Sequence, residues 1–298
     1  MSKNLYEDTI VPLLAGSMDN IILFFKEERI LKSEIICEEC GNALRWIKKS
    51  QIDDGYVWKC FEKLCIKFKI PISIRYGSFL STSKINLGKW LDVLYRWSKN
   101  EQIVNVMKDL NISKPTLVKI FKKMRYQCCK YMSENVPKLG GRNVICQVDE
   151  SLFSHKQKYH RGRSSEEIWV FGIVDTSFKP AKGYVEIVSK RSASTLLPII
   201  RKICLPGTIV HSDQWAAYRR ISEMGYSHET VNHKLHFVDP LTGTHTQHVE
   251  SFWNKLKSRC KKMKGIRKIE LNSYLQEDLW RENNGEHFFK RTLDLIRL

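Results

Sequence analysis

The second half of the chain alternates between short apolar runs and longer amphipathic stretches. Short runs rich in β-branched and aromatic residues predict strands, whereas apolar residues at a spacing of three and four predict helices. The expected order is three strands at 144–149, 168–174 and 184–188, then helix 194–203, strand 208–213, helix 214–224, strand 229–231 and helix 247–263. A meander followed by alternating helices and strands predicts a mixed α/β sheet with helices on its faces.

The segment 84–135 has helical periodicity throughout. Apolar residues recur at helical spacing between Leu87 and Tyr95, and a second helix is expected at 102–110. A third should begin near Pro115, with Ser113 as its N-cap. Two helices joined by a three-residue turn, the second one basic, are typical of a helix-turn-helix that binds DNA. A structural helical linker is the alternative.

The third of these helices is expected to have one packed and one basic face. The packed face comprises Leu117, Ile120, Phe121 and Met124, and the basic face comprises Lys119, Lys122, Lys123 and Arg125. The basic face is the predicted contact with DNA phosphates.

Four of the nine cysteines cluster near the N-terminus. Two residues separate Cys37 from Cys40, Gly41 follows and permits a tight turn, and Cys60 and Cys65 form a second pair. Strand-prone sequence flanks the second pair, so we expect a zinc ribbon in which four thiolates hold one Zn²⁺. Because four residues separate Cys60 from Cys65, a ribbon that keeps its shape without metal remains open.

Pro137 and the pair Gly140–Gly141 interrupt the chain after the helical segment. The predicted domains are therefore a zinc-ribbon-like module at 1–80, a helical helix-turn-helix region at 81–140 and an α/β domain at 141–298.

The composition indicates a globular protein that meets a polyanion. The chain has 42% hydrophobic and 28% charged residues, and 50 Lys and Arg against 32 Asp and Glu give a net charge of +18. Such a charge favours nucleic acid as the partner, with a membrane surface or a larger assembly as alternatives. No apolar run approaches a bilayer span and no secretory signal is present, so neither membrane insertion nor secretion is expected.

Three acids are candidates for a metal-dependent site. Asp149 and Asp213 end predicted strands, and Glu250 lies in the first turn of a predicted helix. Neighbouring strands would bring the two aspartates to one edge of the sheet, and a packed helix would add the glutamate. Carboxylates suit Mg²⁺, and a pair of such ions is typical of phosphodiester cleavage.

The stretch from Gln147 to Lys257 resembles the transposase domain of the Merlin superfamily and its bacterial insertion-sequence relatives. The matching stretches are Val148–Ser151, Lys158–Arg163, Trp169–Gly172, Pro206–Thr208, His211–Tyr218, Val231–His233 and Gly243–Trp253. The resemblance implies a ribonuclease-H-like DDE domain in which Asp149, Asp213 and Glu250 are the catalytic acids. Intervals of 63 and 36 residues separate them.

The resemblance also implies two Mg²⁺ or Mn²⁺ ions per active site and cut-and-paste cleavage and strand transfer at terminal inverted repeats. The partners would be the double-stranded DNA of transposon ends and of the target, with homo-oligomers assembling on that DNA. The compartment would be the nucleus in a eukaryotic host and otherwise the cytoplasm. A related ribonuclease-H-fold nuclease or integrase and a catalytically silent, domesticated DNA-binding protein are the alternatives.

Further residues are predicted to contact DNA or to support the site. Arg161 and Arg163 could grip phosphates, although a solvated basic loop is equally open. The run 255–268 has eight basic residues and no acid, and its predicted DNA contacts are Lys255, Lys257, Lys261 and Lys262. His211, His233 and His248 are expected to orient or pack rather than to ligate. Trp169, Trp215 and Trp253 are expected in the core.

Overall fold

The computed structural model describes residues 6–153, 167–233, 235–263, 265–285 and 287–298. Its contacts divide the chain into two compact units. The first unit comprises residues 1–127 and 286–298, and the second unit comprises residues 128–285. The boundary near residue 80 predicted inside the first unit remains a prediction.

The second unit is built on a five-stranded sheet. Strands β5 (Ile145–Leu152), β6 (Trp169–Asp175) and β7 (Lys182–Val188) form an antiparallel meander. On the other side of β5, β9 (Ile209–Asp213) and β10 (Ser227–Val231) run parallel to it, which gives the order β10-β9-β5-β6-β7. A three-strand meander followed by two strands parallel to its first strand is the ribonuclease-H-like topology, so the predicted fold class is confirmed. Outside this sheet, β4 (Leu139–Gly140) pairs with β8 (Cys204–Leu205).

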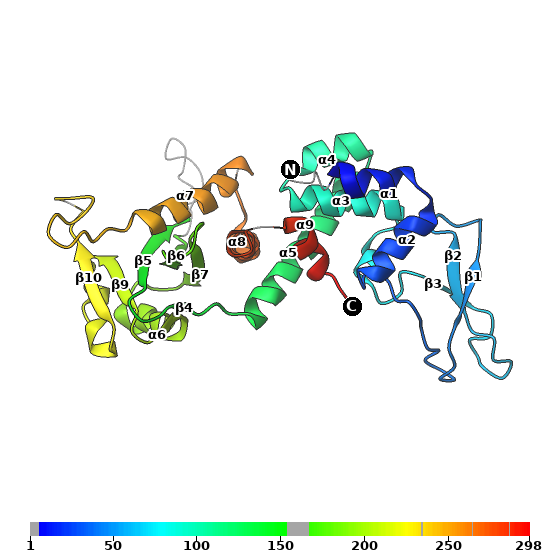
Figure 1. The fold of residues 1–298 in the computed structure, drawn as a ribbon, viewed down its shortest axis with the longest axis horizontal. Coiled ribbons are helices and arrows are strands. Elements are labelled where there is room, and N and C mark those ends of the chain that lie inside the picture. Colours follow the sequence, from blue (N-terminus) through cyan, green and yellow to red (C-terminus); the bar gives the residue numbers. More distant parts are fainter. Residues whose placement is uncertain (1–5, 154–166, 234, 264, 286) are drawn as a thin grey trace. The chain divides into compact units, whose positions relative to one another are not determined.

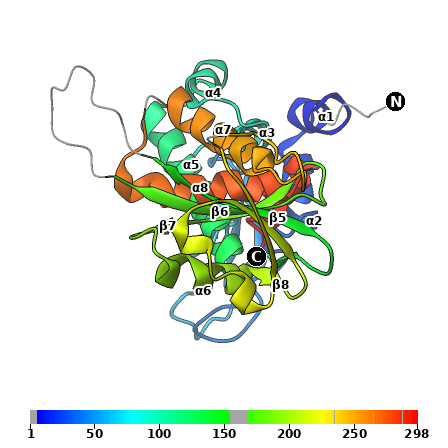
Figure 2. The same cartoon turned by 90° about the vertical axis from the view of Figure 1, so that its left-hand side faces the viewer.

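Helices cover both faces of this sheet (Figures 1 and 2). Helix α6 (Ala193–Ile203) lies on one face, and α7 (Gln247–Lys262) and α8 (Lys268–Asn283) lie on the other. Because neighbouring residues of a strand point to opposite faces, alternate residues of β5 and β6 pack against the helices on the two faces of the sheet. The core under α6 includes Cys146, Val148, Phe171, Ile173, Leu196, Ile200 and Val210.

Glycines on the α7 face let bulky rings approach the sheet closely. A Cβ on Gly172 would lie 2.6 Å from the Trp253 ring, and one on Gly183 would lie 2.7 Å from the Phe252 ring. The aromatic face of α7 therefore packs directly on the backbone of β6 and β7.

Two predictions for the second unit are wrong. Strand β5 runs on to Leu152, so Asp149 lies inside the strand and does not end it. In place of a helix at 214–224 there are two 3-10 turns, η4 (Ala216–Tyr218) and η5 (Ser222–Met224). The tighter turns have a period of three, which turns Tyr218 and Ile221 toward the core, where both are buried.

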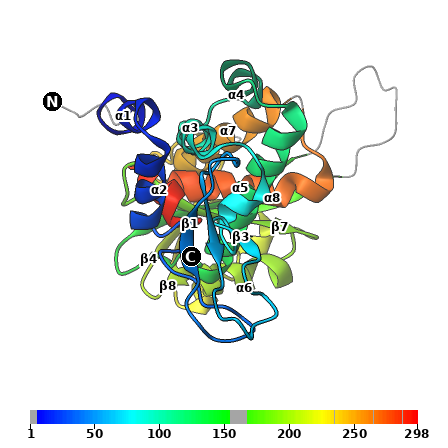
Figure 3. The ribbon, with the colours of Figure 1, turned by 90° about the vertical axis from the view of Figure 1, so that its right-hand side faces the viewer.

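The first unit contains a three-stranded antiparallel ribbon and a group of helices, which face the viewer in Figure 3. The ribbon comprises β1 (Arg45–Lys48), β2 (Tyr56–Lys59) and β3 (Pro71–Ser73). The other elements before the helix-turn-helix region are η1 (Tyr6–Ile10), α1 (Val11–Ala15), α2 (Met18–Glu27) and η2 (Phe79–Thr82).

The helical region has the expected element order. Helices α3 (Leu87–Ser98), α4 (Ile103–Leu110) and α5 (Lys114–Glu134) follow one another, and Asn111 between α4 and α5 adopts a left-handed conformation with φ of 48°. The predicted packed face of α5 is buried. Helix α9 (Phe288–Asp294) packs on α3, so the last residues join the first unit although they were expected with the α/β domain.

No helix in the described part of the chain is long and apolar enough to cross a membrane.

Candidate active site and cysteine cluster

Asp149 lies in the middle of β5 and faces α7. Its carboxylate Oδ2 accepts a hydrogen bond of 3.0 Å from the indole nitrogen of Trp253. Gly172 is the ladder partner of Asp149 on β6, and the absence of a side chain there makes room for that indole. A tryptophan three residues after Glu250 thus links α7 to the strand that bears Asp149.

Asp213 lies beside Asp149 through the register of two parallel strands. In the ladder of β5 and β9, Ile145 pairs with Ile209 and Gln147 pairs with His211. The same offset, continued by two residues, sets Asp149 level with Asp213. Residues level with each other on neighbouring strands point to the same face. Asp213 is fixed in turn by the backbone N–H of Trp215, which donates to its Oδ1 at 2.9 Å.

Glu250 lies in the first turn of α7, as predicted. Its Oε1 accepts a hydrogen bond of 3.0 Å from the Thr246 hydroxyl and lies 3.8 Å from His233 Nε2. The same hydroxyl lies 2.9 Å from His233 Nε2. His233 therefore lies beside a candidate acid and has an orienting position.

The three acids influence one another electrostatically. Burial, together with the nearby charges of Asp213 and Glu250, raises the pKa of Asp149 to about 6, against the opposing effect of the Trp253 N–H. Like charges held close together in a half-buried place favour a proton or a cation. The three carboxylates thus form a concentrated negative site on the α7 face.

Gln147 is a site residue that the sequence analysis missed. It is 1% exposed, and its side-chain oxygen accepts hydrogen bonds from the backbone N–H groups of His248 at 2.9 Å and Val249 at 3.1 Å. Its amide nitrogen lies 3.2 Å from Nδ1 of His245. Gln147 therefore caps the start of α7 from two residues before Asp149. No local sequence signal indicates a cap supplied from 101 residues away.

Glu150 is a second residue that the sequence did not indicate. It follows Asp149 on β5 and so points to the opposite face, toward Tyr218. Burial raises its pKa to about 7, against the opposing effect of the Tyr218 hydroxyl. Within the described residues, its Oε1 and that hydroxyl are both buried without a well-formed hydrogen bond. The alternation of the strand excludes Glu150 from the face that carries the other acids.

His211 and His248 line a hollow of about 280 Å³ that also includes Gln147, Glu229 and His245. His211 is buried, and its Nε2 lies 3.3 Å from Glu229. Burial lowers the pKa of His211, partly opposed by the Glu229 carboxylate. An orienting role for His211 and His248 stays a prediction.

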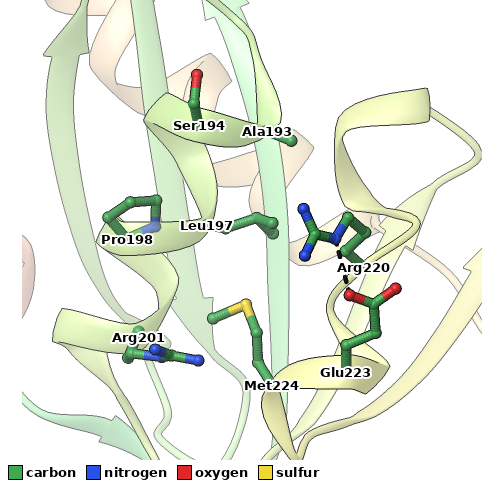
Figure 4. Close-up of a pocket in the computed structure, with 8 residues that line it drawn as sticks. All are labelled: Ala193, Ser194, Leu197, Pro198, Arg201, Arg220, Glu223 and Met224. Atoms are coloured by element: carbon green, nitrogen blue, oxygen red, sulfur yellow. Dashed lines mark hydrogen bonds and ion pairs between the residues drawn. The ribbon is translucent and has the colours of Figure 1, made fainter.

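A second hollow, of about 460 Å³, lies on the α6 face (Figure 4). Leu197 of α6 and Met224 of η5 form its apolar part, and Arg201 and the ion pair of Arg220 with Glu223 at 2.7 Å form its polar part. None of the three candidate acids lines it.

The predicted DNA contacts have different surroundings. Lys119, Lys122, Lys261 and Lys262 are exposed, Lys255 forms an ion pair of 2.7 Å with Glu282, and Lys257 is half-buried with its Nζ 5.4 Å from the Phe153 ring. The position of Lys257 favours contact close to the acids, because the charge of Asp149 acts on its pKa. Lys123 is half-buried and donates to the Thr82 hydroxyl. Arg161 and Arg163 lie outside the described residues.

The predicted exposure of Arg125 and the predicted burial of Trp215 are both wrong. Arg125 is only 5% exposed, so it is no surface contact for phosphate. Arg259, within the predicted basic run, is also withdrawn from the surface by ion pairs with Glu277 and Asp278. Trp253 is buried as expected, but Trp215 is 42% exposed and does not belong to the core.

The four N-terminal cysteines converge in the ribbon. The sulfur of Cys37 lies 3.7 Å from that of Cys65, the sulfur of Cys40 lies 3.7 Å from that of Cys60, and all four sulfurs lie within 4.8 Å of one another. Zinc with four thiolates at about 2.3 Å requires sulfurs about 3.8 Å apart. The cluster is therefore compatible with zinc in spite of the wide spacing of Cys60 and Cys65.

The acids are more widely spaced than the cysteines. Among the described residues, only one group of three or more Cys, His, Asp or Glu side chains has all its ligand atoms within 4.8 Å of one another. The four cysteines form that group. Two ions about 3.5–4 Å apart span more space than one ion does. The donor set, which consists of carboxylates without thiolates, fits Mg²⁺ or Mn²⁺.

Comparisons with known proteins match this chain to a family of transposases. Residues 139–283 match the family model of the ISXO2-like transposase domain. An uncharacterized transposase-like protein of Haemophilus influenzae is 35% identical over 105 residues, which are 35% of this chain and 84% of that protein.

Solved integrase structures are similar at lower identity. The catalytic core domain of BIV integrase is 14% identical, with a TM-score of 0.32, over 48% of this chain and 84% of that one. The HTLV-2 integrase catalytic core domain in complex with magnesium is 16% identical, with a TM-score of 0.29, over 47% and 84%. The fold assignment rests on the strand order described above. On the family model and the Haemophilus relative, the chain belongs to the insertion-sequence transposases with an ISXO2-like transposase domain.

Proposed function

We propose that this transposase cleaves DNA at the terminal inverted repeats of its element and joins the freed ends to target DNA, with Asp149, Asp213 and Glu250 as its catalytic acids. One observation carries the proposal. The register of β5 and β9, continued two residues beyond its last pair, Gln147 with His211, would set Asp149 level with Asp213, and Glu250 lies in the first turn of α7, which packs on β5. Burial raises the pKa of Asp149, and the charges of Asp213 and Glu250 add to that rise, which supports their proximity to Asp149.

Each side chain has a distinct part in this proposal. Asp149 and Asp213 lie on neighbouring strands and are held rigidly by the sheet. The position of Glu250 depends on how α7 packs on that sheet. Two Mg²⁺ or Mn²⁺ ions held by these carboxylates would activate the attacking oxygen and stabilise the leaving oxygen. Trp253 orients Asp149, and Thr246 orients Glu250.

DNA would bind through the basic surface. The net charge of +18 supports a polyanionic substrate, and the exposed lysines of α5 and α7 are the proposed phosphate contacts. Zn²⁺ held by Cys37, Cys40, Cys60 and Cys65 would stabilise the ribbon. Oligomers that form on the transposon ends are part of the proposal.

The experiment compares Asp213→Asn with Glu223→Gln, a surface acid of the same unit that is paired with Arg220. Nicking and strand transfer are measured with Mg²⁺ on DNA that carries candidate repeat ends. Binding to the same DNA is measured in parallel. Asp213→Asn should lose nicking by several orders of magnitude and bind as well as wild type or slightly better, because it removes a negative charge. Glu223→Gln should nick normally.

Three outcomes would change the conclusion. Normal nicking by Asp213→Asn would refute the assignment of the acids. Nicking without joining would favour the nuclease alternative. Wild-type protein that binds repeat ends but never nicks them would favour a domesticated DNA-binding protein.

A further inference from the structure

Trp215 is the most solvent-exposed tryptophan of the chain. Its side chain is 42% exposed, whereas Trp58, Trp90, Trp97, Trp253 and Trp280 are at most 4% exposed. An exposed aromatic surface on a folded chain is a frequent mark of a binding site when polar contacts also hold the ring in place.

Two hydrogen bonds and a guanidinium contact hold Trp215 in place. Its indole nitrogen donates to the carbonyl oxygen of Arg191 at 3.2 Å, and its backbone N–H donates to Asp213. The Arg191 guanidinium lies over the Trp215 ring at 5.1 Å and over the Trp169 ring at 3.6 Å. The indole is thus exposed and also ordered before any ligand arrives, which lowers the entropic cost of binding.

The position of Trp215 restricts what can bind there. Trp215 follows Asp213 by two residues and its backbone N–H donates to that carboxylate, so the indole extends from the end of β9 that carries one of the proposed catalytic acids. An aromatic face beside a guanidinium suits a nucleobase that carries its phosphate. A base inside an intact duplex has both faces covered by its neighbours, so only an unpaired base can use the indole.

We propose that Trp215 and Arg191 form a stacking site for one unpaired nucleobase of the DNA strand held at the acids. This inference rests on the proposed function, since it takes DNA as the substrate. Trp169 supports the site by fixing the guanidinium of Arg191. The site holds a displaced base at the strand end and thereby sets the adjacent phosphodiester against Asp213.

Binding without chemistry tests the proposal. The probes are two duplexes of the same repeat-end sequence, one fully paired and one with a single unpaired base at the predicted cleavage position. Fluorescence anisotropy without added Mg²⁺ gives the Kd of each. Wild-type protein should prefer the unpaired-base duplex, and Trp215→Ala should lose about 5- to 150-fold of affinity for it, the size of one base–aromatic stack.

Phe178→Ala is the matched control, because Phe178 is 41% exposed in the same unit and has Lys182 Nζ 4.1 Å from its ring centre. It should keep the preference. Trp215→Phe retains an aromatic face and should keep part of the preference, and Arg191→Gln should reduce it. Thermal unfolding shows whether Trp215→Ala is folded, and Arg191→Gln tests the site if it is not.

The proposal is overturned if folded Trp215→Ala or Arg191→Gln binds both duplexes like wild type, or if Phe178→Ala loses the preference equally. These outcomes are independent of nicking. Loss of nicking in Asp213→Asn with an unaltered base preference in Trp215→Ala would uphold the proposed function and refute the stacking site.

Discussion

The side-chain oxygen of Gln147, on β5, accepts a hydrogen bond of 3.1 Å from the backbone N–H of Val249, which lies in the first turn of α7. Residues 102 positions apart in the chain thus share a buried hydrogen bond one residue before Glu250. Because helix N-termini have N–H groups without intrahelical partners, a cap from a strand fixes both the start and the position of the helix. The Asp149 strand and the Glu250 helix are joined at this point.

Replacing Gln147 with Met keeps the volume of the side chain but leaves the N–H groups of His248 and Val249 without their acceptor. Buried donors without partners cost about 1–3 kcal/mol each, so the free energy of unfolding should fall by about 2 kcal/mol or more in urea denaturation. Nicking should fall as well, because Glu250 is no longer held in place. Gln247→Met, at an exposed glutamine of the same helix, should match wild type in both. A fully stable Gln147→Met protein would contradict the capping role.

Gly172→Ala should displace the indole of Trp253. The added Cβ would lie 2.6 Å from two ring carbons, and overpacking of this kind costs about 1–3 kcal/mol. Thermal unfolding should show a lower Tm, and nicking should fall because Trp253 orients Asp149. Gly88→Ala in α3 is the control, since its Cβ meets no atom closer than 3.5 Å and alanine favours helices. Equal behaviour of the two variants would count against the Trp253 contact.

Elemental analysis of purified protein should find one zinc per chain, and Cys60→Ser should lose it. Structural zinc contributes directly to folding, so chelation should unfold the ribbon at lower temperature while nicking competence of the second unit can be restored with Mg²⁺. Cys129→Ser, outside the cluster, should keep its zinc. Zinc-free protein with an unaltered unfolding curve would show that the ribbon is stable without metal.

The buried His211 predicts a pH effect on stability. Burial lowers its pKa in the folded state, so between that value and about 6.5 the unfolded chain binds more protons, and stability is lost as the pH falls. The facing groups are Glu229, which opposes this shift, and His245, whose ring charge adds to the shift while its backbone hydrogen bond opposes it. On going from pH 7.5 to 5.5, the Tm of wild type should therefore fall relative to that of His211→Gln by a few degrees. The exposed His287→Gln variant should follow wild type, and parallel curves for all three proteins would refute the effect.

Lys119 and Lys122, two exposed basic residues of α5, should contribute to DNA binding without contributing to chemistry. Replacing both with Gln should weaken binding and make the slope of log K against log salt shallower by roughly 0.9 for each phosphate that the protein no longer neutralises. Residual nicking should persist at high protein concentration. Val118→Gln, an exposed neutral position on the same helix, should leave the salt slope unaltered. An unaltered slope in the double variant would remove α5 from the DNA interface.

The fold class could be predicted from the chain alone because its signals are local. Apolar runs mark β6, β7 and β9, the helical spacing of Val249, Phe252 and Leu256 marks α7, and the pairing of cysteines marks the ribbon. Each pattern lies within one element, so backbone geometry and burial determine it without knowledge of the rest. The candidate acids were found in the same way, as acids that end predicted apolar strands or lie in the first turn of a predicted helix.

The tertiary structure alone decided what depends on non-local partners. The level position of Asp149 and Asp213 follows from which strands pair and in what register, and neither is encoded within a few residues. Gln147 acts on a helix that starts 100 residues later. The basic face of α5 looked uniform in sequence, yet packing buries Arg125, while the period-three turns after Asp213 leave Trp215 in solvent. Burial of a side chain is set by the elements that pack on it, and these come from distant parts of the chain.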